Sequence, residues 1–169
     1  SIHTTEKCIN NNTIKIKLIN NNVKKDIERF IKIAKKYNSD TKFRIDANGA
    51  YDINDAIDLC NSLSSYNIEY IEEPLCNMDV EQVQNLKNKI NIPIAIDETL
   101  YHGNYRDLVN KNLIQFVVLK ASLFGSIKDI FILNKYLSKN NVKIVLSSAI
   151  ENTIGNLSII HLASTLELK

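Results

Sequence analysis

Reactive side chains recur along this 169-residue chain at a nearly constant interval, each at or near the end of a short apolar run. Successive positions are 29, 26, 25, 23 and 27 residues apart. One strand, one helix and two loops use about that much chain, so the spacing predicts a βα repeat. The strand ends of such repeats share one rim, where α/β barrels carry their chemistry. The positions are Lys17, Asp46, Glu72, Asp97, Lys120 and the pair Ser147–Ser148.

Apolar periodicity predicts six βα units. Strand-like runs alternate with segments whose apolar residues recur every three or four positions. Polar residues that favour helix N-caps, among them Asn22, Asp52 and Asp79, stand before the helical segments. Pro74 should end a strand, because it cannot donate to a strand ladder. We expect strands at 13–19, 42–45, 68–71, 92–96, 113–119 and 142–146, with helices beginning near residues 22, 52, 79, 105, 125 and 152.

Alternation of this kind predicts an α/β fold with a parallel sheet covered by helices. A closed (β/α)8 barrel typically needs about 250 residues, so six units predict an incomplete TIM-type barrel. We expect residues 1–12 to be a poorly structured end and residues 13–169 to form a partial barrel domain. An open doubly wound sheet is the alternative. It would be expected to carry a glycine-rich phosphate loop after its first strand, and residues 17–20 (KLIN) are not one.

Composition argues against several classes of partner and site. The net charge is +2 without a dense basic stripe, so nucleic acid is not expected as a partner. The longest apolar runs, such as 113–119, are far below membrane-spanning length, so no membrane association is expected. Cys8, Cys60 and Cys76 form no CxxC or Cys/His cluster, which favours a reducing compartment without structural zinc. Cys60 lies on a helical apolar stripe and is expected in the core.

Three of the recurring residues are carboxylates at successive strand ends. If Asp46, Glu72 and Asp97 converge, they repel by roughly 4 kcal/mol per close pair at an effective dielectric constant of about 20. A divalent cation removes that penalty. Oxygen ligands without histidine or cysteine favour Mg²⁺, with Mn²⁺ as the alternative ion. The sequence therefore predicts a magnesium site on this rim.

Lysines flank the carboxylates on both sides. Lys15 and Lys17 are two residues apart and share one strand face, which makes Lys17 a candidate base. Lys120 ends an apolar run, so its stem is expected to be buried with its head at the rim. A metal between two lysines suits proton abstraction next to a carboxylate, because the cation stabilises the charge that develops. Elimination, racemisation or cycloisomerisation could follow.

These residues resemble the enolase superfamily in its muconate lactonising branch, and within it the o-succinylbenzoate synthase family of menaquinone and phylloquinone biosynthesis. The resemblance covers about residues 13–165. It is carried by Lys15-Ile16-Lys17, Asp46-Ala47-Asn48, Glu72-Glu73-Pro74, Asp97-Glu98, Lys120 and the stretches 94–100 (IAIDETL), 117–126 (VVLKASLFGS) and 145–155 (VLSSAIENTIG).

The resemblance implies an enzyme of the carbon–oxygen lyase class. It would dehydrate 2-succinyl-6-hydroxy-2,4-cyclohexadiene-1-carboxylate to o-succinylbenzoate through an enediolate. Lys17 would take the α-proton and return it to the departing hydroxyl, and Lys120 would stabilise the enediolate from the other face. Asp46, Glu72 and Asp97 would hold Mg²⁺. The residues expected to support ligands or substrate are Lys15, Arg44, Asn48, Glu73, Ser147 and Ser148.

The resemblance also implies a superfamily C-terminal barrel domain without its N-terminal capping domain. Family members carry an N-terminal capping domain that closes over the substrate, and we expect that domain or other flanking chain to complete this one. The family's pathway implies the cytoplasm, or the plastid stroma for an organelle-encoded chain.

Two other functions stay open. A racemase of N-acylamino acids or an epimerase of dipeptides would use the same metal site and both lysines. A non-catalytic barrel remnant is the alternative from a different class, although such copies usually lose their metal ligands first.

Overall fold

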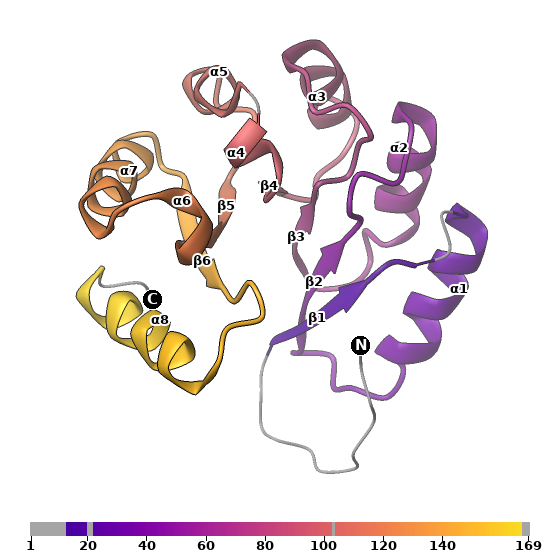
Figure 1. Cartoon of the computed structure of the whole chain (residues 1–169). Coiled ribbons are helices and arrows are strands. Elements are labelled where there is room, and N and C mark those ends of the chain that lie inside the picture. The colour runs from indigo at the N-terminus through magenta and orange to yellow at the C-terminus, as the bar shows by residue number, and fades with distance from the viewer. Residues whose placement is uncertain (1–12, 20–21, 103, 167–169) are drawn as a thin grey trace. The chain divides into compact units, whose positions relative to one another are not determined.

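The computed structural model describes residues 13–19, 22–102 and 104–166. The chain divides into two compact units, Ser1–Ile94 and Ala95–Lys169. In Figure 1 the strands alternate with helices along the chain in both units. The predicted poorly structured end, residues 1–12, lies outside the described residues.

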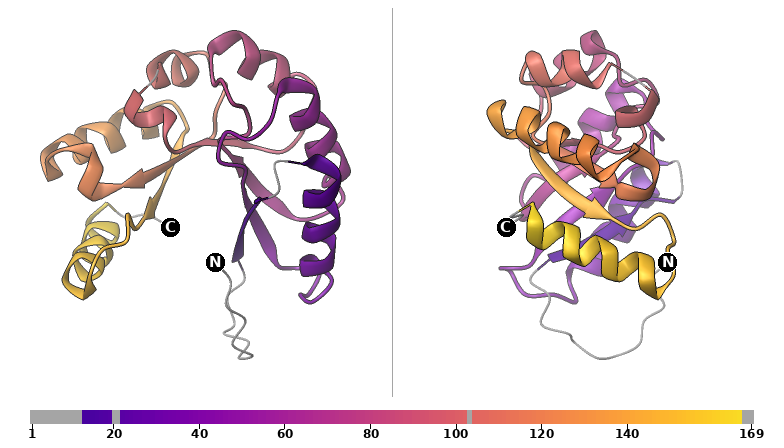
Figure 2. Two further views of the ribbon diagram at one scale, coloured as in Figure 1. Left: turned by 45° about the vertical axis from the view of Figure 1, so that its right-hand side comes forward. Right: turned by 60° about the vertical axis from the view of Figure 1, so that its left-hand side comes forward.

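The first unit contains three parallel strands, each followed by a helix. β1 pairs with β2 and β2 with β3, and Lys17, Asp46 and Glu72 occupy equivalent positions across the three strands. Figure 2 shows all three helices on the same side of these strands. The elements are β1 (Thr13–Lys17), α1 (Val23–Ala34), β2 (Lys42–Asp46), α2 (Ile53–Ser62), β3 (Ile68–Glu72) and α3 (Val80–Lys87).

The predicted N-caps of the first unit are confirmed. The Asn22 side chain accepts a hydrogen bond from the backbone N–H of Lys25 at 3.1 Å, and α1 begins at the next residue. Asp52 and Asp79 do the same for α2 and α3, at 2.9 and 2.8 Å. Each cap satisfies a backbone N–H that has no partner inside the helix, so these short-range sequence signals set the helix starts correctly.

The core of the first unit is apolar apart from four buried polar or charged residues, Asp26, Thr41, Glu72 and Glu73. Cys60 is buried as expected, and burial raises the pKa of its thiol to about 12. Asp26, however, lies in the buried stripe of α1 with no exposed surface. Its carboxylate accepts hydrogen bonds from the Tyr51 hydroxyl at 2.8 Å and from the Ile19 N–H at 3.2 Å. These bonds offset the cost of burying the group.

The second unit repeats the same arrangement. β4 pairs with β5 and β5 with β6, all in parallel, and Lys120 stands opposite Ser147. β4 is shorter than the predicted 92–96, and two four-residue helices, α4 and α6, were not predicted. The elements are β4 (Ile94–Ile96), α4 (Thr99–His102), α5 (Tyr105–Asn110), β5 (Phe116–Lys120), α6 (Ala121–Phe124), α7 (Ile127–Lys139), β6 (Lys143–Ser147) and α8 (Thr153–Thr165).

Two capping motifs begin the long helices of this unit. Ser126 and Asp129 form a reciprocal capping box at the start of α7. The Asn152 side chain accepts the N–H of Gly155 at 2.9 Å and so begins α8. Among the described residues, no helix combines the length and apolar character needed to cross a membrane.

The fold class is confirmed. Six strands in chain order, each leading into at least one helix, are the βα units of an incomplete TIM-type barrel. A doubly wound sheet would place helices on both faces, whereas the helices of the first unit share one face.

Candidate active site

The first unit brings three of the predicted residues into one row. Lys17, Asp46 and Glu72 are the last residues of β1, β2 and β3, and the strand register places Lys17 beside Asp46 and Asp46 beside Glu72. The alternation of β1 puts Lys15 and Lys17 on one face and the fully buried Ile16 on the other. The predicted convergence of these residues at one sheet edge is therefore present in this unit.

Lys15 is the residue that neutralises the two carboxylates. Its Nζ lies 3.1 Å from Asp46 Oδ2 and 2.7 Å from Glu72 Oε2. The Glu72 side chain is 1% exposed and that of Asp46 14%. Burial by itself lowers the pKa of Lys15, but Glu72 and then Asp46 outweigh it, so the pKa is raised and Lys15 is an ammonium at neutral pH. The sequence indicated only a supporting role for this lysine.

Lys17 is held through its backbone. Its carbonyl accepts a hydrogen bond from the Arg29 guanidinium of α1 at 2.6 Å. This contact fixes the end of β1 while the side chain of Lys17 remains exposed. The two lysines of the Lys-Ile-Lys motif therefore differ in their surroundings, one being paired to carboxylates and the other being exposed at the strand end.

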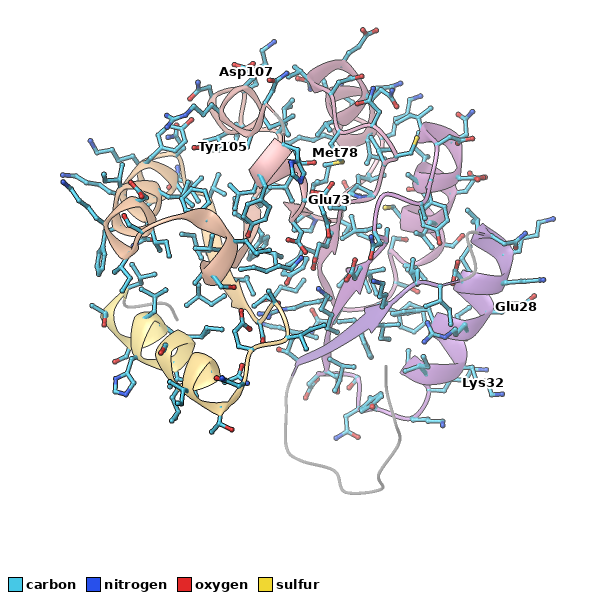
Figure 3. All side chains as sticks on the ribbon, in the orientation of Figure 1. Glu28, Lys32, Glu73, Met78, Tyr105 and Asp107 are labelled. Atoms are coloured by element: carbon cyan, nitrogen blue, oxygen red, sulfur yellow. The ribbon has the colours of Figure 1, made fainter. Side chains whose placement is uncertain are left out.

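The supporting residues of this unit lie on and just beyond the strands. Arg44 donates to Glu69 at 2.5 Å and stacks on the Tyr70 ring at 5.3 Å, contacts that the sequence did not predict. Asn48 (φ 53°) and Glu73 (φ 43°) both adopt the left-handed backbone region. Asparagine adopts this region readily, so the backbone of Glu73 is the more strained of the two. Figure 3 shows Glu73 just beyond the end of β3, where its side chain is buried.

The second unit pairs its strand-end lysine with carboxylates. Lys120 Nζ forms an ion pair with Asp97 Oδ2 and lies 3.5 Å from Glu98 Oε1. Burial lowers the pKa of Lys120, but the hydrogen bond and charge of Asp97 outweigh this, so the pKa is raised. The Tyr101 hydroxyl accepts the Lys120 N–H at 2.8 Å. Tyr101 was missed in the sequence, because it lies in the unpredicted helix α4 and its partner Lys120 is 19 residues away.

The serine pair takes part in a hydrogen-bonded group. Ser147 ends β6 opposite Lys120. The Ser148 hydroxyl donates to the carboxylate of Glu151, which also accepts the Ser122 hydroxyl at 2.6 Å. Glu151 was not predicted as a site residue, since its spacing does not place it at a strand end.

The carboxylates suit a magnesium ion by their chemistry. Within the described residues of either unit, no three His, Cys, Asp or Glu side chains form a group that could hold a metal. In the first unit, however, oxygens of Asp46 and Glu72 already gather around one cationic atom, Lys15 Nζ. Oxygen donors of this kind fit Mg²⁺.

Comparisons with known proteins identify the family of this chain and the enzymes to which it is similar. Residues 6–168 match the family model described as "Enolase C-terminal domain-like". A hydrophobic dipeptide epimerase from Enterococcus faecalis is 29% identical over 154 residues, which are 90% of this chain and 43% of that protein. An o-succinylbenzoate synthase from Thermobifida fusca is 27% identical over 129 residues, 74% of this chain and 38% of that protein.

A solved structure agrees with the fold. The dipeptide epimerase from Enterococcus faecalis V583, complexed with Mg and the dipeptide L-Leu-L-Tyr, matches with a TM-score of 0.80 at 28% identity. The match covers 90% of this chain and 43% of that one. The chain therefore spans less than half the length of these relatives.

Proposed function

Because this chain belongs to the enolase C-terminal domain-like family, we propose that it carries the proton-transfer residues of an enzyme acting on a small carboxylate substrate. One observation carries the proposal: in both units, carboxylates at or just beyond the strand ends are paired with a lysine. Lys15 contacts Asp46 and Glu72, and Lys120 contacts Asp97. Ionisable groups whose pKa is shifted by a specific charged partner are candidates for functional sites.

We propose that Asp46, Glu72 and Asp97 are ligands of Mg²⁺ or Mn²⁺. When bound, such an ion supplies positive charge next to the carboxylate oxygens of the substrate. Lys15 has a supporting role, because its ammonium holds the Asp46 and Glu72 carboxylates together at neutral pH. The chain covers less than half of its relatives' length, which supports the proposal that further chain, such as a capping domain, closes over the substrate.

The two catalytic lysines have different proposed roles. Lys17, exposed at the end of β1 with its backbone held by Arg29, takes the proton from the carbon next to the substrate carboxylate. Lys120 stays protonated beside Asp97 and Glu98 and faces the negative charge that develops on the substrate. The raised pKa of Lys120 supports this second role.

The proposed reaction is the dehydration that forms o-succinylbenzoate. The C–H bond next to the carboxylate breaks and its proton moves to Lys17 Nζ. The C–O bond of the ring hydroxyl then breaks, and the same proton leaves with that hydroxyl as water, so that the ring becomes aromatic. Residues 145–155 (VLSSAIENTIG) and the similarity to the Thermobifida fusca synthase support this choice.

A dipeptide epimerase or N-acylamino acid racemase is the second candidate. The similarity to the Enterococcus faecalis epimerase favours it, because that match covers 90% of this chain. In this reaction Lys120 would donate its proton to the face of the substrate opposite Lys17. Both lysines would then be acid/base catalysts, whereas in the dehydration only Lys17 is.

The deciding experiment uses the protein at its full natural length with Mg²⁺. We expect o-succinylbenzoate to form from 2-succinyl-6-hydroxy-2,4-cyclohexadiene-1-carboxylate, and Lys17→Ala to abolish it. Lys32→Ala is the control, because Lys32 is exposed on α1 and points away from the strands (Figure 3). Epimerisation of dipeptides or N-acylamino acids without dehydration would favour the second candidate. Absence of Mg²⁺ binding together with full activity of Lys17→Ala would contradict both.

A further inference from the structure

One carboxylate in the second unit joins two segments that follow neighbouring strands. Glu151 accepts the hydroxyl of Ser122, from α6, at 2.6 Å and the hydroxyl of Ser148, from the segment after β6. Its own N–H donates back to Ser148 Oγ at 3.2 Å. We call these three residues the Glu151 clamp. The clamp ties the segment that follows Lys120, the last residue of β5, to the segment after β6.

The first turn of α8 is shaped around the Glu151 side chain. A Cβ atom added at Gly155 would lie 2.6 Å from Glu151 Cβ and 2.9 Å from Glu151 Cγ. Atoms at those distances clash, so this helical position accepts only glycine while Glu151 keeps its place. Asn156 Nδ2 also donates to the Glu151 carbonyl at 3.2 Å. The position of Glu151 is therefore set by several independent contacts.

Packing does not bury helix α6, although its Phe124 ring contacts the Tyr101 ring edge-on at a centroid distance of 6.3 Å. None of its four residues is buried. A pocket of about 190 Å³ lies beside it, lined by α6 residues Ala121 and Ser122 and by apolar residues of α7 and α8 such as Ile130 and Leu162. A short helix with an open side can shift unless a polar contact anchors it.

The anchored helix starts at the proposed catalytic lysine. Lys120 is the N-cap residue of α6, and Ser122 stands two residues further on. The Tyr101 hydroxyl also holds the backbone of Lys120, by accepting the hydrogen bond of the Lys120 N–H. We propose that Glu151 is a positioning residue that fixes Lys120 for catalysis by anchoring α6 through Ser122. This inference builds on the proposed function only in taking Lys120 as a catalytic group.

The electrostatics favour the clamp at neutral pH. The hydroxyls of Ser122 and Ser148 donate to the carboxylate and lower the pKa of Glu151. Hydrogen bonds to a charged acceptor are stronger than neutral ones. Glu151→Gln keeps the shape of the side chain but removes its charge. Ser122→Ala removes only the hydrogen bond between Glu151 and α6. The two variants therefore distinguish the effect of the charge from the effect of the contact with α6.

The experiment combines a local and a catalytic measurement on the full-length protein with Mg²⁺. Amide hydrogen exchange by mass spectrometry should be faster over residues 120–126 in Glu151→Ala and Ser122→Ala, and unchanged over α2. Each of these two alanine variants should lower kcat for dehydration about tenfold. The KM should stay within about twofold of wild type, as expected for a misplaced catalytic group. Glu151→Gln should fall between wild type and Glu151→Ala. Asp107→Asn, an exposed acid on α5 (Figure 3), is the isosteric control and should match wild type.

The double variant distinguishes positioning from separate effects. If Glu151 acts through Ser122, Glu151→Ala combined with Ser122→Ala should lose no more activity than either alone. Multiplied losses, or unchanged exchange over residues 120–126, would overturn the inference. So would faster exchange with unchanged kcat. If the wild-type protein neither dehydrates nor epimerises its substrates, the proposed function fails. An exchange response would then assign the clamp a structural role only, which overturns the catalytic part of the inference.

Discussion

Lys15→Met should destabilise the first unit, because the Lys15 ammonium bridges two carboxylates and compensates their mutual repulsion. Its Nζ lies 3.1 Å from Asp46 and 2.7 Å from Glu72, so the two carboxylate oxygens are at most about 6 Å apart. At an effective dielectric constant of about 20, two such charges repel by about 3 kcal/mol. The Lys15 side chain is 40% exposed, and water screens part of this. We expect a loss of about 2 kcal/mol in the free energy of unfolding.

Magnesium should reverse part of that loss. Mg²⁺ and the Lys15 ammonium compete for the same carboxylate oxygens, so the ion should stabilise Lys15→Met more than wild type. The increase follows from ligand binding to the folded state alone. This outcome tests the proposed ligands Asp46 and Glu72 without any measurement of activity.

The assay is urea unfolding at neutral pH, followed by circular dichroism with and without Mg²⁺. Lys32→Met, on the outer face of α1, is the matched control and should change stability by less than about 0.5 kcal/mol. The reasoning is refuted if Lys15→Met is as stable as this control. It is also refuted if Mg²⁺ raises the free energy of unfolding of Lys15→Met and of wild type equally.

Three further outcomes are expected. Tyr51→Phe should lower the free energy of unfolding in urea by about 1–3 kcal/mol, because it removes the hydroxyl that donates to buried Asp26. Tyr37→Phe, at the surface, is the control and should change it little. Equal losses in the two variants would contradict this reasoning. Stability should fall at alkaline pH as Lys120 loses its proton. Its contribution is fully present below the unfolded-state pKa of 10.5 and is lost as pH rises through the higher folded value, so Lys120→Met should flatten that part of the curve. Asp52→Ala should cost about 1 kcal/mol in thermal or urea unfolding by removing the cap of α2, and Asp52→Asn, which keeps an acceptor, should cost less.

Much of the fold could be predicted because its signals are local. Strand ends follow from where an apolar run meets a reactive residue, and helix starts follow from caps such as Asn22 and Asp79, whose side chains bond within three residues. The missed elements, α4 and α6, have four residues each, too few to show an apolar period.

For the candidate site, the sequence predicted which residues lie at the strand ends but not which of them contact one another. The motif Lys15-Ile16-Lys17 made both lysines candidates on one face. The distances to Asp46 and Glu72 then identified Lys15 as the paired one. Asp26 shows the same limit. Its place in the apolar stripe of α1 has no explanation in the sequence, because its hydrogen-bond partner Tyr51 is 25 residues away along the chain.

The sequence by itself determined the βα repeat, the helix caps and the positions of carboxylates and lysines at or just beyond the strand ends. These follow from periods and spacings along the chain, which set the direction of each side chain from its strand. Only the tertiary structure decided which charges meet. It paired Lys15 with Asp46 and Glu72, and Lys120 with Asp97, and it joined Ser122 to Glu151 across 29 residues of sequence. The physical reason is that ion pairs and hydrogen bonds act over about 3 Å in space, and only the packed backbone brings distant residues that close.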